Sequence, residues 1–180
     1  MSLIKKSLRH PKAHPEKRST FCQELQKYKE EGYPLVFLDE SGFAHDMPRT
    51  HGYAPKGQRC YGKQDWGAKG RTNVIGALLA GVLLTVSLFQ MTINTEIFTT
   101  WVVSDLLPKL PAKSLIILDN ASFHKGSKMQ QILQEAGHAL LYLPPYSPDL
   151  NPIEKKWAQA KAIRRRVGGH IHELFQNYKI

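Results

Sequence analysis

The chain has 180 residues, which fits a single domain of ordinary size. Its hydrophobic content of 42% is too high for a disordered chain and is sufficient for a buried core. The formal net charge of +10 favours a polyanionic partner, DNA or RNA ahead of a membrane surface, although a merely basic soluble protein would carry the same charge.

The cysteines and the apolar segments indicate the cellular compartment. Cys22 and Cys60 lie far apart and form no CxxC pair, which favours free thiols in a reducing compartment over a disulfide. No long apolar segment follows Met1, as a secretory signal would require. The apolar stretch 74–89 is shorter than a membrane span of about 20 residues and is interrupted by Gly81. The sequence therefore predicts a cytoplasmic protein with no membrane partner.

The N-terminal part differs in composition from the rest of the chain. Residues 1–31 are polar and basic, and they predict a linker with a helix from about Pro15 to Glu31. The globular pattern then begins, so we expect a domain over residues 32–180. Its first element, 35–38, is the short continuous apolar run of a strand buried on both faces.

The middle of the chain predicts a loop, a hairpin and a helix. Residues 44–70 are rich in glycine, proline and charge, which indicates a loop or a short irregular strand. Residues 71–80 and 82–91 predict two strands around a turn at Gly81. An amphipathic helix is expected to start at residue 94 or 95 and to end near residue 107.

The last third alternates between strands and helices. Strands are predicted at 114–118 and 139–143, a helix at 125–136, and a final helix from about residue 151. The order is three strands, helix, strand, helix, strand, helix. This order predicts an α/β fold with one mixed five-stranded sheet flanked by helices.

Three carboxylates stand next to these elements. Asp39 and Asp119 each follow an apolar run, and Glu154 opens the final helix. Each has a purely structural alternative, because both aspartates occur in turn-like sequences, while Asn151 and Glu154 fit a capping box. If both runs are central strands, however, the two aspartates lie at the carboxyl edge of the sheet, where α/β sheets place their sites.

A divalent cation would explain why the three carboxylates lie together. Like charges at short range raise each other's pKa, and a hard cation with oxygen ligands removes that cost. Two ions about 4 Å apart can stabilise the attacking and leaving oxygens of a phosphoryl transfer. The chain has no compact His/Cys set, which argues against zinc. The sequence predicts two Mg²⁺ or Mn²⁺ ions.

Two motifs carry a family resemblance. Asp119-Asn120-Ala121 with His124, followed by Leu-Pro-Pro-Tyr-Ser-Pro-Asp-Leu-Asn-Pro-Ile-Glu at 143–154, resembles the signature of the DDE transposases. Residues 38–43 resemble the first catalytic strand of that group. Thirty-four residues separate Asp119 from Glu154, a spacing similar to that of the mariner-like superfamily and its bacterial insertion-sequence-630 family. The similarity covers about residues 35–165 and implies a ribonuclease-H-like fold.

The resemblance implies an activity and a set of catalytic residues. Asp39, Asp119 and Glu154 would form the metal-binding triad. A metal-activated water would cut DNA at the ends of the element, and the freed 3′-hydroxyl would attack target DNA, usually at a TA dinucleotide. Glu40, Asn120 and His124 accompany the motif and are expected to support the triad, although each also fits a solvated acid, a turn amide or a surface histidine.

The final helix is strongly basic. A cationic face beside the metal site would hold phosphates, whereas a solvated basic helix end would complement the helix dipole. The residues expected to contact DNA are Lys155, Lys161, Arg164 and Arg165. The residues expected to pack on the core are Ile153, Trp157, Ala160 and Val167.

Family members usually carry an N-terminal helix-turn-helix region that reads the terminal repeats, and residues 1–31 resemble the linker after such a region. The resemblance therefore implies the second frame of a split transposase, or a truncated remnant. Its partners would be transposon-end and target DNA in a bacterial nucleoid, and either a second copy or an upstream helix-turn-helix product. The alternatives are a non-catalytic DNA-binding or regulatory fragment, and a nuclease of RNA–DNA hybrids, against which the proline-rich block argues.

Overall fold

The computed structural model describes residues 11–48, 51–62, 67, 69–177 and 180. The described residues form one mixed five-stranded sheet with the order β3-β2-β1-β4-β5. β1 and β2, and β2 and β3, pair antiparallel, whereas β4 runs parallel to β1 and to β5. The strands are β1 Leu35–Ala44, β2 Arg71–Leu79, β3 Val82–Phe89, β4 Leu115–Leu118 and β5 Ala139–Tyr142. The predicted fold class is confirmed.

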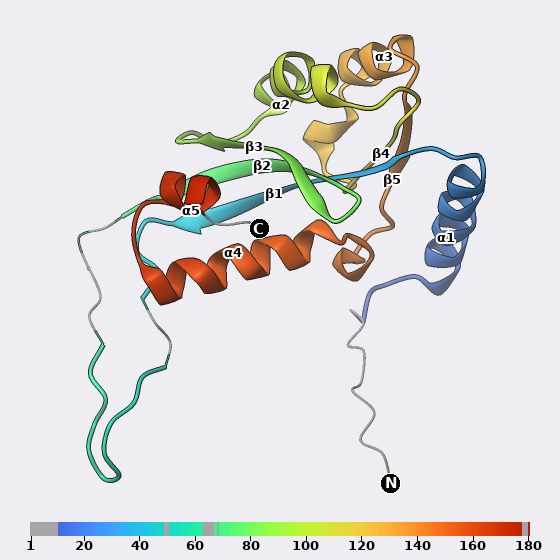
Figure 1. Ribbon diagram of the computed structural model, residues 1–180. Coiled ribbons are helices and arrows are strands. Elements are labelled where there is room, and N and C mark those ends of the chain that lie inside the picture. Colours follow the sequence, from blue (N-terminus) through green and yellow to red (C-terminus); the bar gives the residue numbers. More distant parts are fainter. Residues whose placement is uncertain (1–10, 49–50, 63–66, 68, 178–179) are drawn as a thin grey trace, which may run out of the picture.

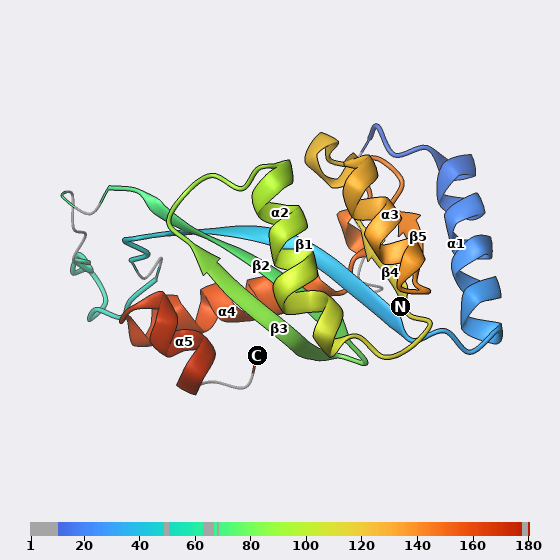
Figure 2. The ribbon, with the colours of Figure 1, turned by 90° about the horizontal axis from the view of Figure 1, so that it is seen from above.

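Helices cover both faces of this sheet (Figures 1 and 2). Two helices lie on one face, two on the other, and one stands beside the β4–β5 end. On the first face are α2 Thr95–Trp101 and α3 Ser127–Glu135, on the second α4 Ile153–Val167 and α5 Ile171–Asn177, and at the end α1 Pro15–Glu30. In the part of the chain that the structure describes, no helix is long and apolar enough to cross a bilayer.

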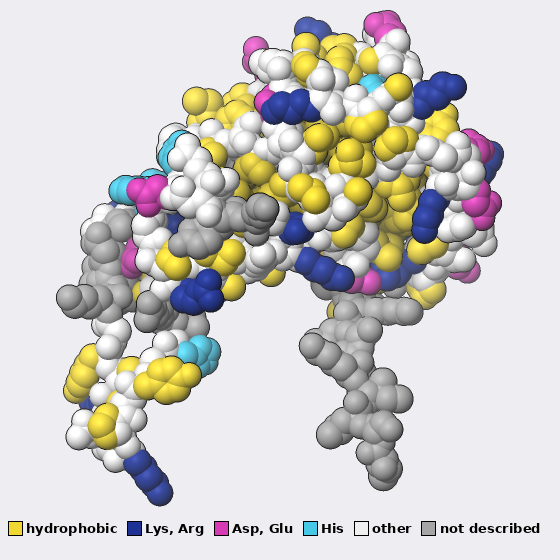
Figure 3. Space-filling model, viewed as in Figure 1, with side chains coloured by type: hydrophobic (Ala, Val, Ile, Leu, Met, Phe, Trp, Pro, Cys, Tyr) yellow, Lys and Arg dark blue, Asp and Glu magenta, His cyan; other side chains and the backbone are white. Residues whose placement is uncertain are grey.

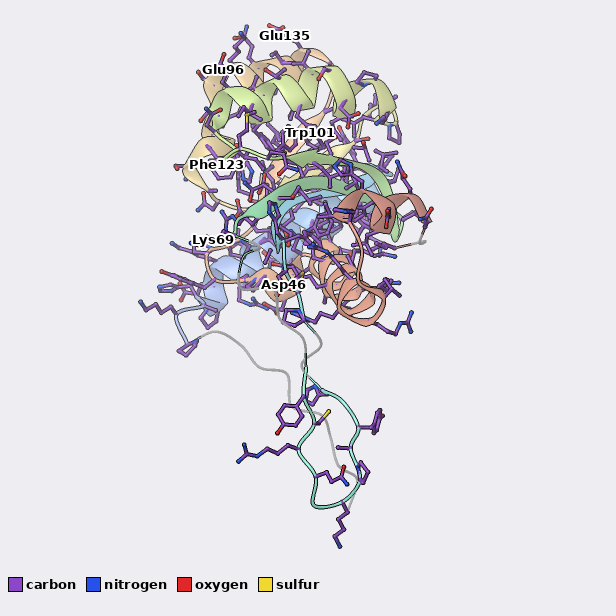
Figure 4. The ribbon with its side chains drawn as sticks, turned by 90° about the vertical axis from the view of Figure 1, so that its left-hand side faces the viewer. Asp46, Lys69, Glu96, Trp101, Phe123 and Glu135 are labelled. Atoms are coloured by element: carbon purple, nitrogen blue, oxygen red, sulfur yellow. The ribbon has the colours of Figure 1, made fainter. Side chains whose placement is uncertain are left out.

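The core lies between the sheet and each helical layer. β4 is fully buried along its whole length, which explains its continuous apolar sequence. Trp101 of α2 and Phe123 lie between the sheet and the first helical layer (Figure 4). Phe21 anchors α1 against β4 and β5, so the described part of the predicted linker packs on the sheet. Residues 1–10 of that linker lie outside the described residues.

Several predicted boundaries differ from the structure. β1 continues to Ala44, six residues beyond the apolar run. The helix capped by Asn94, whose side chain accepts a hydrogen bond from the Ile97 backbone N–H, becomes a π-helix at Val102–Leu106 and a 3₁₀ turn at Leu107–Lys109. Pro108 explains the change, because it has no N–H for an α-helical hydrogen bond. The sequence did not predict α5. The described residues 51–62 contain no strand, so the loop is the correct one of the two alternatives for this segment.

The hairpin turn is placed as predicted. Ala80 and Gly81 connect β2 and β3, with φ angles of 49° and 83°. Two consecutive residues with positive φ are typical of a type I′ turn, whose twist suits a two-residue hairpin.

Candidate active site

A cleft of about 400 Å³ opens between the end of β4 and the start of α4. All three carboxylates from the sequence motif line it, and they come from β1, from the residue after β4, and from the first turn of α4. The proline-rich segment 143–148 forms another wall, together with Asn120, Ala121 and Asn151. Residues that are up to 115 positions apart in the sequence therefore share one cavity.

The parallel register of β1 and β4 brings the two aspartates together. Leu35 pairs with Leu115, and Phe37 with Ile117, so continuing the register by two positions sets Asp39 opposite Asp119. Asp39 does not end its strand as the sequence indicated. It lies in the middle of β1, which runs on beside β2 after β4 has ended. The site therefore lies where β4 ends and β1 continues beyond it.

Asp39 is held in a mostly buried position on the α4 side of the sheet. Its side chain accepts a hydrogen bond from Trp157 Nε1 at Oδ2, at 3.0 Å, and the residue is 9% exposed. Burial raises the pKa of Asp39 to about 8, and the negative charges of Glu154, Glu40 and Asp119 add to this shift. Without a compensating cation this carboxyl therefore keeps its proton at neutral pH.

His124 connects two other carboxylates on the opposite side of β1. Its ring is fully buried, and its Nδ1 lies 2.6 Å from Asp119 Oδ1 while its Nε2 lies 2.7 Å from Glu40 Oε1. Both nitrogens face carboxylates, so both donate hydrogen bonds only when the ring is cationic. Burial alone would lower the pKa of His124, but the two acceptors raise it to about 9.

Asp119 is correspondingly held in its charged form. Burial works against the charge, but the hydrogen bonds from His124 and from the Ala121 backbone N–H, at 2.9 Å, keep the pKa of Asp119 below its usual value. Asn120 is exposed and lines the cleft beside it. Asp39 and Asp119 therefore differ: in the absence of metal one is neutral and the other ionised.

The start of α4 is not the capping box that the sequence indicated. Pro152 occupies the N-cap position, and no side chain among the described residues caps the helix. Asn151 Nδ2 instead donates to the Leu38 carbonyl at 3.3 Å, because the loop packs against β1. Glu154 is exposed at the cleft.

The basic residues of α4 occupy different environments. Lys155 and Arg165 are exposed, and Lys161 Nζ lies 5.4 Å from the centre of the Phe43 ring. Arg164 is buried, and its guanidinium donates to the Ala44 and His45 carbonyls at 2.6 and 2.9 Å. We therefore correct the expected DNA contact of Arg164 to a structural role.

The buried row of α4 also ends differently from the prediction. Ile153, Trp157 and Ala160 are buried as expected, but Val167 is 47% exposed. Arg164, four residues after Ala160, is the last buried residue of this row, because its guanidinium donates hydrogen bonds to backbone carbonyls at the end of β1.

Comparison with known proteins agrees with this architecture. Residues 34–173 match the family model described as DDE superfamily endonuclease. The chain belongs to this family. A sequence comparison with curated proteins found no significant match.

Solved structures similar to this chain show the same fold. The Mos1 transposase paired-end complex with the left transposon end superposes with a TM-score of 0.70 at 21% identity, over 91% of this chain and 54% of that one. The mariner Mos1 paired-end complex with Mg superposes with a TM-score of 0.65 at 18% identity, over 97% of this chain and 63% of that one. The Mos1 catalytic domain superposes with a TM-score of 0.60 at 14% identity, over 93% of this chain and 78% of that one. The chain thus spans 54% to 64% of the first three structures it matches.

The donor set of the cleft fits a hard divalent cation. Asp39, Asp119 and Glu154 supply carboxylate oxygens to one cleft, and a cation there would offset the burial and the neighbouring negative charges that raise the pKa of Asp39. Among the described residues, however, no group of three or more His, Cys, Asp and Glu side chains is already arranged to hold a metal ion. The carboxylates share the cleft without converging on one point.

Proposed function

We propose that this chain is the catalytic domain of a Mg²⁺- or Mn²⁺-dependent DDE transposase from the insertion-sequence-630 branch of the mariner-like superfamily. It would cleave DNA at the ends of the element and join the 3′ end to target DNA. The observation that carries this proposal is the single cleft in which Asp39, Asp119 and Glu154 meet, within a domain of the DDE endonuclease family. We assign the catalytic domain to residues 32–180 and the preceding residues to a basic linker.

The three carboxylates have the role of metal ligands in this proposal. Bound Mg²⁺, as two ions, would activate the attacking oxygen and neutralise charge on the phosphate. Asp39 loses its proton when it becomes a ligand, whereas Asp119 is already ionised. Glu154 is exposed at the cleft, so a cation that it holds there could also bind a phosphate of the DNA.

The neighbours of the triad maintain its charge and orientation. His124 holds Asp119 through Nδ1, and Glu40 holds the other ring nitrogen, so both contacts fix the orientation of the buried ring behind Asp119. Phe98 and Phe123 enclose the same ring at centroid distances of 4.4 and 4.2 Å. Asn120, exposed beside Asp119, is placed to contact a DNA backbone in the cleft.

DNA is the proposed substrate, both as transposon end and as target. Cations of α4 would bind phosphates next to the cleft, and Figure 3 shows Lys and Arg side chains at the level of this helix. The α4 residues assigned to this contact are Lys155 and Arg165, which are exposed, and Lys161, which is partly buried beside the Phe43 ring. We further propose action as a homodimer or with an upstream helix-turn-helix product, in the cytoplasm and at the bacterial nucleoid.

The experiment is DNA nicking and strand transfer by the purified protein, alone and fused to a helix-turn-helix reader, on DNA that carries the ends of the element. We expect cleavage that requires Mg²⁺ or Mn²⁺ and that Asp119→Asn abolishes. A folded fusion protein without metal-dependent cleavage, or an Asp119→Asn variant as active as the wild type, would refute the proposal.

A second candidate function is a non-catalytic DNA-binding or regulatory fragment. It is favoured by the exposed cations Lys155 and Arg165 of α4, which could bind DNA phosphates without chemistry in the cleft. It predicts salt-sensitive DNA binding and inhibition of an intact transposase in trans, without cleavage under any metal condition.

A further inference from the structure

Trp157 makes an unusual hydrogen bond for a core tryptophan. Its side chain is 1% exposed, and its indole N–H donates to Asp39 Oδ2 at 3.0 Å across 118 positions of sequence. A buried indole N–H needs an acceptor, and backbone carbonyls or hydroxyls serve this purpose as well as any other group. Here the acceptor is a carboxylate that lines the candidate active site.

Gly76 provides the space for this indole ring. It lies on β2 directly opposite Asp39 in the β1–β2 register. A Cβ atom on Gly76 would stand 2.5 Å from Trp157 Cη2 and 2.9 Å from Cζ2. The ring therefore rests on the backbone of the strand beside Asp39, and any side chain at position 76 would push it away.

The segment 151–157, which includes the start of α4, makes two hydrogen bonds to the same part of β1. Asn151 donates to the Leu38 carbonyl, and Trp157 donates to Asp39. Glu154 lies midway between these two residues in the sequence, three positions from each. The two bonds therefore fasten the segment that carries Glu154 to the strand that carries Asp39.

We propose that Trp157 is a positioning residue that orients the Asp39 carboxylate for a divalent cation shared with Glu154, and that Gly76 is required to seat it. This inference rests on the proposed function of the cleft as a metal site. The N–H bond restricts the carboxylate to one orientation, so less freedom remains to be lost when a metal binds.

Packing alone is the alternative explanation for Trp157. Its ring also contacts Phe43 and Phe175 edge to face, at centroid distances of 6.4 and 6.3 Å. Trp157→Phe separates the two explanations, because it keeps an aromatic ring in the core and removes the N–H donor. Trp101→Phe is a matched control, because its indole N–H also bonds a side-chain oxygen at 3.0 Å, on Ser87, and neither residue lines the cleft that contains the three carboxylates.

The test is Mn²⁺ binding to the full chain, measured by electron paramagnetic resonance. We expect Trp157→Phe to weaken binding by about 10- to 100-fold, as for other partners that support a metal ligand, and Trp101→Phe to leave it unchanged. In a protein that already carries Asp39→Asn, adding Trp157→Phe should not weaken Mn²⁺ binding further, because the carboxylate that Trp157 orients is no longer present. Gly76→Ala should weaken binding to a similar extent by displacing the ring.

A second measurement on the wild type does not depend on whether a variant folds. The indole N–H resonance of Trp157, one of three in the chain, is assigned on the wild type by triple-resonance spectroscopy. It should shift as Mg²⁺ is added, while the resonance of Trp101 stays in place. If the wild type binds Mn²⁺ and Trp157→Phe binds it equally well, the proposed role of Trp157 is refuted while the proposed function stands. A Trp157 resonance that does not shift with Mg²⁺ refutes the same role. A wild type that binds no Mn²⁺ overturns the proposed function as well.

Discussion

Replacing His124 with glutamine removes the positive charge that lies between two carboxylates. The buried ring contacts Asp119 and Glu40 at 2.6 and 2.7 Å, and glutamine can keep a hydrogen bond but no charge. The pKa of His124 is raised from 6.5 to about 9 in the folded protein. Since one pKa unit corresponds to about 1.4 kcal/mol, the charged ring contributes on the order of 3 kcal/mol to the free energy of unfolding.

The pH dependence has a definite sign. A group whose pKa is higher in the folded state stabilises the fold below its unfolded pKa and loses that contribution as the pH rises through the folded value. For His124 the loss extends from about pH 6.5 to about pH 9. The pKa of Asp39, raised to about 8, lowers stability over an overlapping range, but this contribution is present in both proteins.

The assay is urea unfolding of metal-free wild type and His124→Gln at pH 6 and at pH 9.5. The difference in unfolding free energy between the two proteins should be about 3 kcal/mol larger at pH 6 than at pH 9.5. His124→Gln should also weaken Mn²⁺ binding at pH 7, because Asp119 loses the partner that orients it. A difference in stability that is the same at both pH values would refute the charged bridge.

Three other predictions concern separate contacts. The affinity for Mn²⁺ should rise about tenfold per pH unit up to about pH 8 and then level off, because the metal displaces the proton of Asp39. Titration calorimetry at several pH values measures this affinity, and an affinity that does not change with pH would contradict the prediction. Arg164→Ala should cost about 2 kcal/mol in thermal unfolding, because it removes two hydrogen bonds to backbone carbonyls. Arg165→Ala should leave stability unchanged and reduce the salt dependence of DNA binding by about one unit. Equal stabilities of the two variants would argue against the structural role of Arg164. Arg18 and Asp149 form an ion pair with two hydrogen bonds, at 2.9 and 2.7 Å, between α1 and the loop before α4. Arg18→Ala should therefore lower the free energy of unfolding by about 1 kcal/mol. In a double-mutant cycle, the variant with Asp at position 18 and Arg at position 149 should recover part of this loss.

Much of the site could be predicted because its signals are local. The apolar runs before Asp39 and Asp119, the hairpin turn at Gly81 and the motif that ends at Glu154 are each contained within a dozen residues. Hydrophobic periodicity and turn chemistry act over that range, so the element order from β1 to α4 follows from the sequence, while the candidate triad also rests on the family resemblance.

The errors concern side chains whose partners are distant in sequence. Arg164 resembles a solvated helix cation, yet its acceptors are carbonyls 119 and 120 positions away. Asn151 resembles an N-cap, yet it bonds Leu38 at a separation of 113. Trp157 resembles a simple core residue, yet its N–H reaches Asp39. A local pattern cannot indicate such partners, because the sheet register and the approach of α4 decide them.

The sequence by itself determined the order of the elements from β1 to α4 and the chemistry of the donor set, since periodicity and residue type are properties of short segments. Only the tertiary structure decided that Asp39 sits within a long strand, neutral and bonded to Trp157, while Asp119 is ionised beside a cationic His124. Burial and neighbouring charge set these protonation states, and both depend on what the folded chain packs around each carboxylate.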